Sequence, residues 1–128
     1  AAFGVHVARC TVYNNTNNGI SCGAACRIED NHCRFNGNGP EVGAGILVKT
    51  GSNRTLVTNN TVINSDFGIK VDAANNFIIG NTVGVSTTHF EIVAGNRVGV
   101  ILTLPTSAAI SGNTGGTTIT SPDANFSY

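Results

Sequence analysis

The chain has 128 residues, enough for one domain, and its 7 basic and 7 acidic residues give a formal net charge of zero. Only 11% of the residues are charged, which excludes the basic surface that nucleic-acid-binding proteins usually carry. The apolar fraction of 41% argues against disorder. No apolar run approaches the roughly 18 residues of a membrane span. We therefore expect one folded domain with neither nucleic acid nor a membrane span.

The dominant signal is an internal repeat. Gly-Ile pairs at 19–20, 45–46 and 68–69 each open a short run of alternating apolar residues, and His89-Phe90 takes the place of a fourth pair. These markers recur at intervals of roughly 21 to 26 residues, within the range typical of repeat proteins. Loops of unequal length between stacked coils of a solenoid produce such a pattern.

Each repeat continues with two further short runs. The second runs are 27–29, 56–58 and 77–79, and the third runs are 32–34, 61–63 and 82–84. Alternation with a period of two gives every run one apolar face, and stacking the coils buries these faces in a common core. The side chains predicted to point inward are Ile20, Cys22, Ile28, Ile46, Val48, Val57, Val62, Ile69, Val71, Ile78, Val83, Phe90 and Ile92. The sequence thus predicts an all-β solenoid of about four to five coils, each of roughly 21–26 residues.

One asparagine recurs between the second and third runs, at Asn31, Asn60 and Asn81. Asparagine tolerates left-handed turn geometry, and its amide can hydrogen-bond nearby backbone or its own copy in the next coil. We interpret these three residues as a structural ladder rather than as catalytic or ligand-binding groups.

The string Asn-Asn-Phe-Ile-Ile-Gly-Asn-Thr-Val at 75–83, with the Gly-Ile pair at 68–69, resembles the repeat of right-handed parallel β-helix proteins. That group includes the pectate-lyase-like superfamily and secreted bacterial β-helix proteins of unknown function. The resemblance covers roughly residues 4–101. It implies a right-handed parallel β-helix from a bacterial protein that is extracellular or at the cell surface.

The repeat weakens after Val100, and Pro105 breaks its pattern. Solenoids need capped ends because a terminal coil leaves its apolar face without a neighbour. We therefore expect coils over residues 1–104 and an irregular C-terminal cap or exit segment of the same domain over residues 105–128.

Enzymes of the resembled superfamily are polysaccharide lyases and hydrolases that use clustered carboxylates. Glycoside hydrolysis requires two carboxyl groups about 5 to 9.5 Å apart. The repeat instead places Glu91 beside Lys70 and Asp72 beside Lys49 in outward columns, which indicates ordinary surface pairing. We predict no catalytic residue, no cofactor and no metal site.

Several outward positions of the second and later runs are apolar or cationic. The binding candidates are Arg27, Leu56, Phe77 and Arg97, which share one outward column, and Ile79 in the next. Exposed apolar residues that stand alone need no explanation, whereas a contiguous patch would indicate a contact surface. Both interpretations remain open at this point.

These observations favour a non-catalytic extracellular scaffold or recognition module that contacts polysaccharide or another surface partner. The absence of Trp and the presence of only 2 Tyr weaken a sugar platform built on aromatic stacking. Two alternatives remain: a polysaccharide lyase or glycoside hydrolase of the β-helix type, and a self-assembling, trimeric fibre or spike segment that associates with its own copies.

The four cysteines allow two interpretations. Aligning the coils at the asparagine turn places Cys10 opposite Cys33, one coil away, at the strand spacing of about 4.8 Å. Disulfides accept Cα separations of about 4.4 to 6.8 Å, so a Cys10–Cys33 bond is possible, and Cys22 and Cys26 flank a bend that suits a second one. Alternatively, all four are reduced thiols that act as small core hydrophobes.

Overall fold

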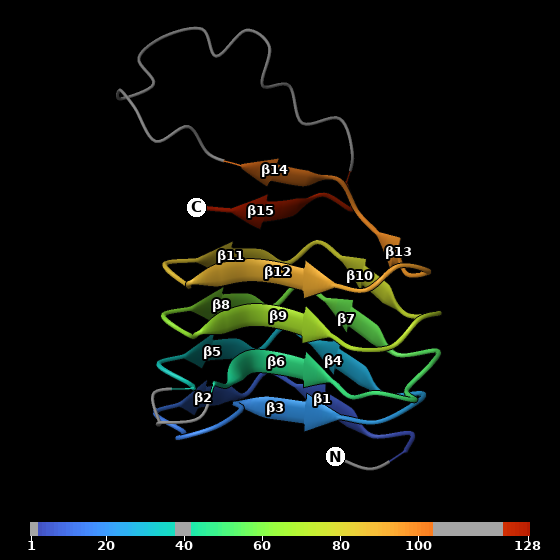
Figure 1. Ribbon diagram of the computed structural model, residues 1–128, viewed down its shortest axis with the longest axis horizontal. Coiled ribbons are helices and arrows are strands. Elements are labelled where there is room, and N and C mark those ends of the chain that lie inside the picture. Colours follow the sequence, from blue (N-terminus) through green and yellow to red (C-terminus); the bar gives the residue numbers. More distant parts are fainter. Residues whose placement is uncertain (1–2, 38–41, 104–121) are drawn as a thin grey trace, which may run out of the picture.

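The computed structural model describes residues 3–37, 42–103 and 122–128. These residues form fifteen strands and no helix, and hence no helix with the length and hydropathy of a membrane span. The strands stack as a parallel solenoid of about five turns, which confirms the predicted fold class (Figure 1). In Figure 1 the near strands run to the right and the far strands return to the left as the chain climbs, so the solenoid is right-handed.

Three parallel sheets form the sides of the solenoid, and successive coils supply one strand to each. Sheet A contains β1 (His6–Ala8), β4 (Arg27–Glu29), β7 (Leu56–Thr58), β10 (Phe77–Ile79) and β13 (Arg97–Val98). Sheet B contains β2 (Thr11–Tyr13), β5 (His32–Arg34), β8 (Thr61–Ile63), β11 (Thr82–Gly84), β15 (Asn125–Ser127) and β14 (Ile101–Thr103). Sheet C contains β3 (Ile20–Cys22), β6 (Ala44–Val48), β9 (Phe67–Val71) and β12 (Thr88–Ile92).

The core lies between the three sheets. In sheet A, Ile28, Val57 and Ile78 are direct partners in neighbouring strands, and all three are fully buried. All the residues predicted to point inward belong to this core or pack against it. Phe90 and Ile92 are only partly buried, because β12 is the edge strand of sheet C at the C-terminal end of the solenoid, where no further strand of that sheet covers them.

All three corners of a coil use a residue with positive φ, followed in most coils by a polar side chain. Between sheets A and B, Asp30 and Asn59 have φ values of 55° and 54° and precede Asn31 and Asn60. Between sheets C and A, Asn75 has a φ of 63° and precedes the buried Asn76. The left-handed residue turns the chain sharply, and the next side chain is thereby directed toward the inside of the corner.

The three asparagines of the predicted ladder lie one above another between sheets A and B. The backbone N–H and the side-chain Nδ2 of Asn31 both donate to Oδ1 of Asn60 at 3.0 Å, and Asn60 donates in the same way to Asn81. Each Nδ2 also donates to a backbone carbonyl, such as that of Ile28 for Asn60. These bonds satisfy amides that are almost completely buried, so the ladder holds the corners in register.

A strand from the end of the sequence completes the last coil. β15 lies between β11 and β14 and is parallel to both, so it takes the place next to β11 that chain order would give to β14 (Figure 1). Within the predicted C-terminal cap, residues 125–127 therefore form a regular strand of sheet B. Residues 105–121 of the cap lie outside the described residues.

Candidate functional site

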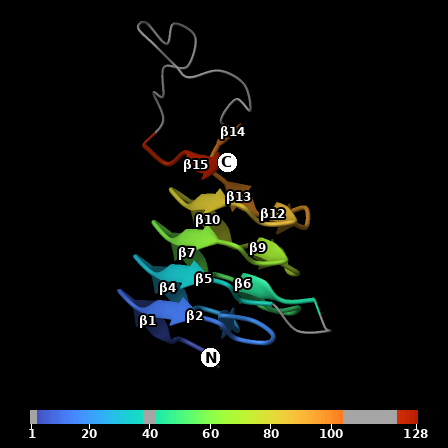
Figure 2. The ribbon, with the colours of Figure 1, turned by 90° about the vertical axis from the view of Figure 1, so that its left-hand side faces the viewer.

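The binding candidates lie together on the outward face of sheet A. Strand pairing aligns Arg27 with Leu56, Leu56 with Phe77, and Phe77 with Arg97 on four consecutive strands. Ile79 lies on β10 in the adjoining outward column. Figure 2 shows how these strands stack along the solenoid. Because Phe77 is 44% exposed and Leu56 is half-buried, this face carries a short apolar strip between two arginines.

The two ends of this strip differ in charge. At one end, Arg27 Nε donates to Glu29 Oε2 at 2.6 Å, and His6 Nε2 lies 2.6 Å from the other carboxylate oxygen of Glu29. The hydrogen bond from Arg27 holds the pKa of Glu29 below its usual value despite partial desolvation, with His6 adding to the effect. At the other end, the Arg97 guanidinium lies 5.9 Å from the centre of the Phe77 ring. The charge of Arg27 is thus balanced by a carboxylate, whereas Arg97 is set against an aromatic ring.

A second group of side chains lies on the outward face of sheet C. Lys70 Nζ is 2.8 Å from Glu91 Oε1, 3.8 Å from Asp72 Oδ1 and 4.6 Å from the centre of the Phe67 ring. A groove of about 370 Å³ runs past Lys70, Asp72, Phe67 and Leu47. Lys70 therefore pairs with Glu91 as the repeat predicted, and Asp72 reaches the same ammonium group.

The chemistry of this second group is that of an ion network. The hydrogen bond to Glu91 raises the pKa of Lys70 despite some desolvation, and Asp72 acts in the same direction. A lysine that abstracts a proton must be neutral, and a raised pKa makes that state rarer at neutral pH. The geometry thus fits an ion pair better than general-base catalysis.

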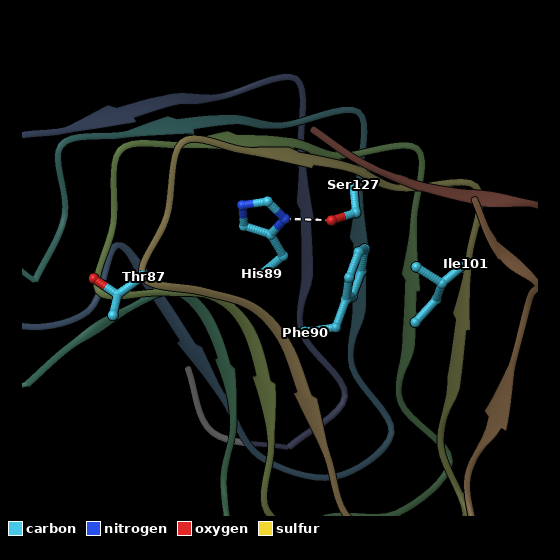
Figure 3. A pocket seen from close by; sticks show the side chains of 5 residues that line it. All are labelled: Thr87, His89, Phe90, Ile101 and Ser127. Carbon is cyan, nitrogen blue, oxygen red and sulfur yellow. Dashed lines mark hydrogen bonds between the residues drawn. The ribbon is translucent and has the colours of Figure 1, made fainter. Parts of the chain in front are cut away.

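A third site is a pocket at the last coil, with a volume of about 330 Å³ (Figure 3). His89 Nδ1 and Ser127 Oγ share a hydrogen bond in it, and Phe90, Ile101 and Thr87 line the rest. A serine bonded to a histidine is the first requirement of a nucleophilic pair. Ser127 is only 7% exposed and occupies the inward position of β15, so the contact primarily satisfies a buried hydroxyl.

Sequence reasoning missed this pair because the two residues are 38 positions apart. A signal was nevertheless present, because residues 125–128 repeat the pattern of residues 81–84. In both segments an asparagine is followed by a short strand of the third run. Reading residues 125–128 as an extra third run would have placed Ser127 in the core column.

The register of sheet B corrects the predicted alignment of the cysteines. Val12, and not Cys10, is the partner of Cys33. The backbone N–H of Cys10 donates to Oδ1 of Asn31, so Cys10 occupies the ladder position itself, away from the alignment that favoured a bond. No disulfide joins the cysteines, all of which are among the described residues. Burial raises the pKa of the Cys22 and Cys33 thiols to about 12.

Comparisons with protein-family profiles, with curated proteins and with solved structures found no match to this chain. In the described part of the chain, no three His, Cys, Asp or Glu side chains lie close enough together to hold a metal ion.

Proposed function

We propose that this chain is a non-catalytic, extracellular scaffold or recognition module whose contact surface is the outward face of sheet A. The observation that carries the proposal is the alignment of Arg27, Leu56, Phe77 and Arg97 on four consecutive strands. We further propose that the ligand is a polysaccharide with acidic groups, which lies across these strands along the solenoid axis.

The chemistry of the face suits such a ligand. Neighbouring strands lie about 4.8 Å apart, so the face offers side chains at regular intervals to an extended polymer. Phe77 and Leu56 present apolar surface to the C–H faces of sugar rings. The guanidinium of Arg97 can form paired hydrogen bonds with a carboxylate, and such charge-assisted bonds are strong and directional.

The alternative of a lyase or hydrolase has weaker support. It would place the chemistry at Lys70, where Asp72 and Glu91 converge. The raised pKa of Lys70 opposes its use as a base. Release of soluble oligosaccharides from pectin, alginate or xylan, abolished by Glu91→Gln, would favour this alternative over the recognition module.

The test of the proposed function is a binding screen of the purified chain against acidic and neutral polysaccharides. We expect binding to an acidic member, and a loss of affinity of at least about tenfold in Phe77→Ala and in Arg97→Ala, because each truncation removes one of the main side chains proposed to contact the ligand. Lys70→Ala on sheet C is the matched control and should bind as the parent chain does. Unchanged binding by both sheet A variants, or no binding to any polysaccharide, would contradict the proposal.

A further inference from the structure

The place of β15 in sheet B is a binding slot for a strand. Phe126 N–H donates to the Asn81 carbonyl at 2.7 Å, and Tyr128 N–H donates to the Val83 carbonyl at 2.9 Å. On the other side, Asn125 N–H donates to the Val100 carbonyl at 2.7 Å, next to β14. The segment is thus bonded on both edges, as a central strand of a sheet is.

The side chains of the segment fit positions that the preceding coils define. Oδ1 of Asn125 accepts from the backbone N–H and Nδ2 of Asn81, and its Nδ2 donates to the carbonyls of Ile78 and Gly99. Asn125 therefore extends the asparagine ladder by one step. β14 cannot do the same, since the residue in its corresponding position is Ile101, which has no polar side-chain atom.

The inward side of the slot is shaped for a small residue. In the two preceding coils, a Cβ on Gly45 would lie 2.1 Å from a methyl group of Val62, and a Cβ on Gly68 would lie 2.1 Å from one of Val83. In the last coil, His89 stands in the glycine position and Ser127 in the valine position. The smaller serine leaves room for the imidazole and hydrogen-bonds to it. The slot thus selects an asparagine, followed two residues later by a small polar side chain.

We propose that this slot is a strand-binding site that accepts residues 122–128 of a second copy of this chain in place of its own. The contacts of the segment with β11, β14 and His89 would be the same in either case, and exchange of an identical element between copies is a low-cost route to association. Residues 104–121 join β14 to the segment, and a stretch of that length spans at most about 60 Å, enough to reach a neighbouring molecule. Dilution favours the chain's own segment, and high concentration favours exchange.

The first experiment uses the full-length Asn125→Ala variant as acceptor. This change weakens the resident segment and leaves β11, β14 and His89 unaltered. A fluorescent peptide of residues 122–128 is titrated into it and followed by anisotropy. We expect binding at least about tenfold tighter than to the unaltered chain, whose own segment competes. A matched peptide with alanine at the position of Asn125 should bind at least about tenfold more weakly than the peptide with asparagine, because it lacks the ladder bonds.

The second experiment needs no variant. Two preparations of the unaltered chain with different tags are mixed at high concentration, incubated and examined by native mass spectrometry after dilution. We expect dimers that carry both tags, formed slowly because each segment must first leave its own slot. Equal binding of the two peptides to a folded acceptor would overturn the proposal. So would the absence of mixed dimers after prolonged incubation, and this outcome decides the question if Asn125→Ala does not fold.

Discussion

Inner coils and end coils use the same positions of the repeat differently. In an inner coil, Gly68 faces Val83, whereas in the last coil His89 faces Ser127. The inner pair lies on β9 and β11, which follow one another closely along the chain, whereas the last pair includes a residue from a distant segment. A coil in this solenoid is therefore defined by complementary side chains at fixed positions, and continuity of the chain is not required.

Equivalent residues of the inner and end coils also differ in how deeply they are buried. Ile28, Val57 and Ile78 form one inward column of sheet A and are fully buried, whereas Val98, the next member of that column, is 39% exposed. The number of covering coils thus determines how much each repeat position contributes to stability. Substitutions at matched positions of inner and end coils should reveal this difference.

The largest effect is expected from Val57→Asp. It buries a carboxylate without a partner in the centre of the core, and such a change costs several kcal/mol, enough to unfold a domain of ordinary stability. Val98→Asp, in the same column, should remain folded because water reaches that position. Far-UV circular dichroism and thermal melting distinguish the two variants. Equal losses of structure would show that end and inner coils are equally buried.

A smaller effect is expected from alanine substitutions in the ladder. Asn60→Ala leaves two buried donors of Asn31 without an acceptor and removes the bond to Ile28, so we expect a loss of about 3 kcal/mol in the free energy of unfolding. Asn125→Ala also leaves two donors of Asn81 without an acceptor, but in the last coil water can reach these donors when the terminal strand detaches, so we expect a smaller loss of about 1.5 kcal/mol. Urea denaturation gives both values, and a larger loss for Asn125→Ala would reverse the proposed order.

The pair at the last coil can be converted to the inner type. Ser127→Val alone should be destabilising, since the valine collides with His89, and His89→Gly alone leaves a buried hydroxyl without its partner. The double variant recreates the Gly68–Val83 pair. We expect the double variant to be more stable, by about 1 kcal/mol or more, than the added effects of the two single substitutions predict, as residues in contact commonly show. Strict additivity would mean that the two positions do not interact.

Chemical labelling of the thiols should affect the structure least. The reactivity of the exposed thiol should nevertheless differ strongly from that of the buried ones. Cys10 in the first coil is exposed, whereas Cys22, Cys26 and Cys33 are buried. At about pH 8, Cys10 should react quickly with a thiol reagent in the native protein, and the other three only after denaturation. Mass spectrometry of the labelled chain counts the modified residues. Rapid labelling of Cys33 in the folded protein would show that the inner coils open readily.

These thiols also predict a dependence of stability on pH. Burial raises the pKa of Cys22 and Cys33 from the ordinary value of 9.0 to about 12. The folded state then binds more protons than the unfolded state above about pH 9, so stability should fall as the pH rises from about 9 toward 12. Urea denaturation at a series of pH values measures this slope, and replacing both cysteines by alanine should flatten it.

The sequence predicted the inner coils well because their signals are local. Alternating residues such as Ile69 and Val71 fix the inward face, and the recurrence of Asn31, Asn60 and Asn81 marks one corner. The polar columns of the other corners were less visible, since they mix residue types. Thr55, Asn76 and Asn96 form one such column between sheets C and A, in which each backbone N–H donates to the next side chain as in the ladder.

The last coil could not be predicted by following the chain. Its third strand comes from residues 125–127, long after β14 has ended at Thr103, and nothing local indicates which strand it will join. The cysteine alignment failed for a related reason. Cys10 stands where the other coils have asparagine, so an alignment on the asparagine turn places the first coil out of register. For the site, the repeat indicated which residues share the face of sheet A but not their contacts.

The interposed strand has a consequence for the order of folding. Ladder bonds between inner coils join residues 21 or 29 positions apart, whereas the bond from Asn81 to Asn125 spans 44 positions. Closing a longer loop costs more entropy, and contacts of long sequence separation form more slowly. During synthesis the inner coils can assemble as they leave the ribosome, but the last coil must wait for Asn125. Until Asn125 and Ser127 have been synthesised, the donors of Asn81 lack their acceptor and the imidazole of His89 lacks its hydrogen-bond partner.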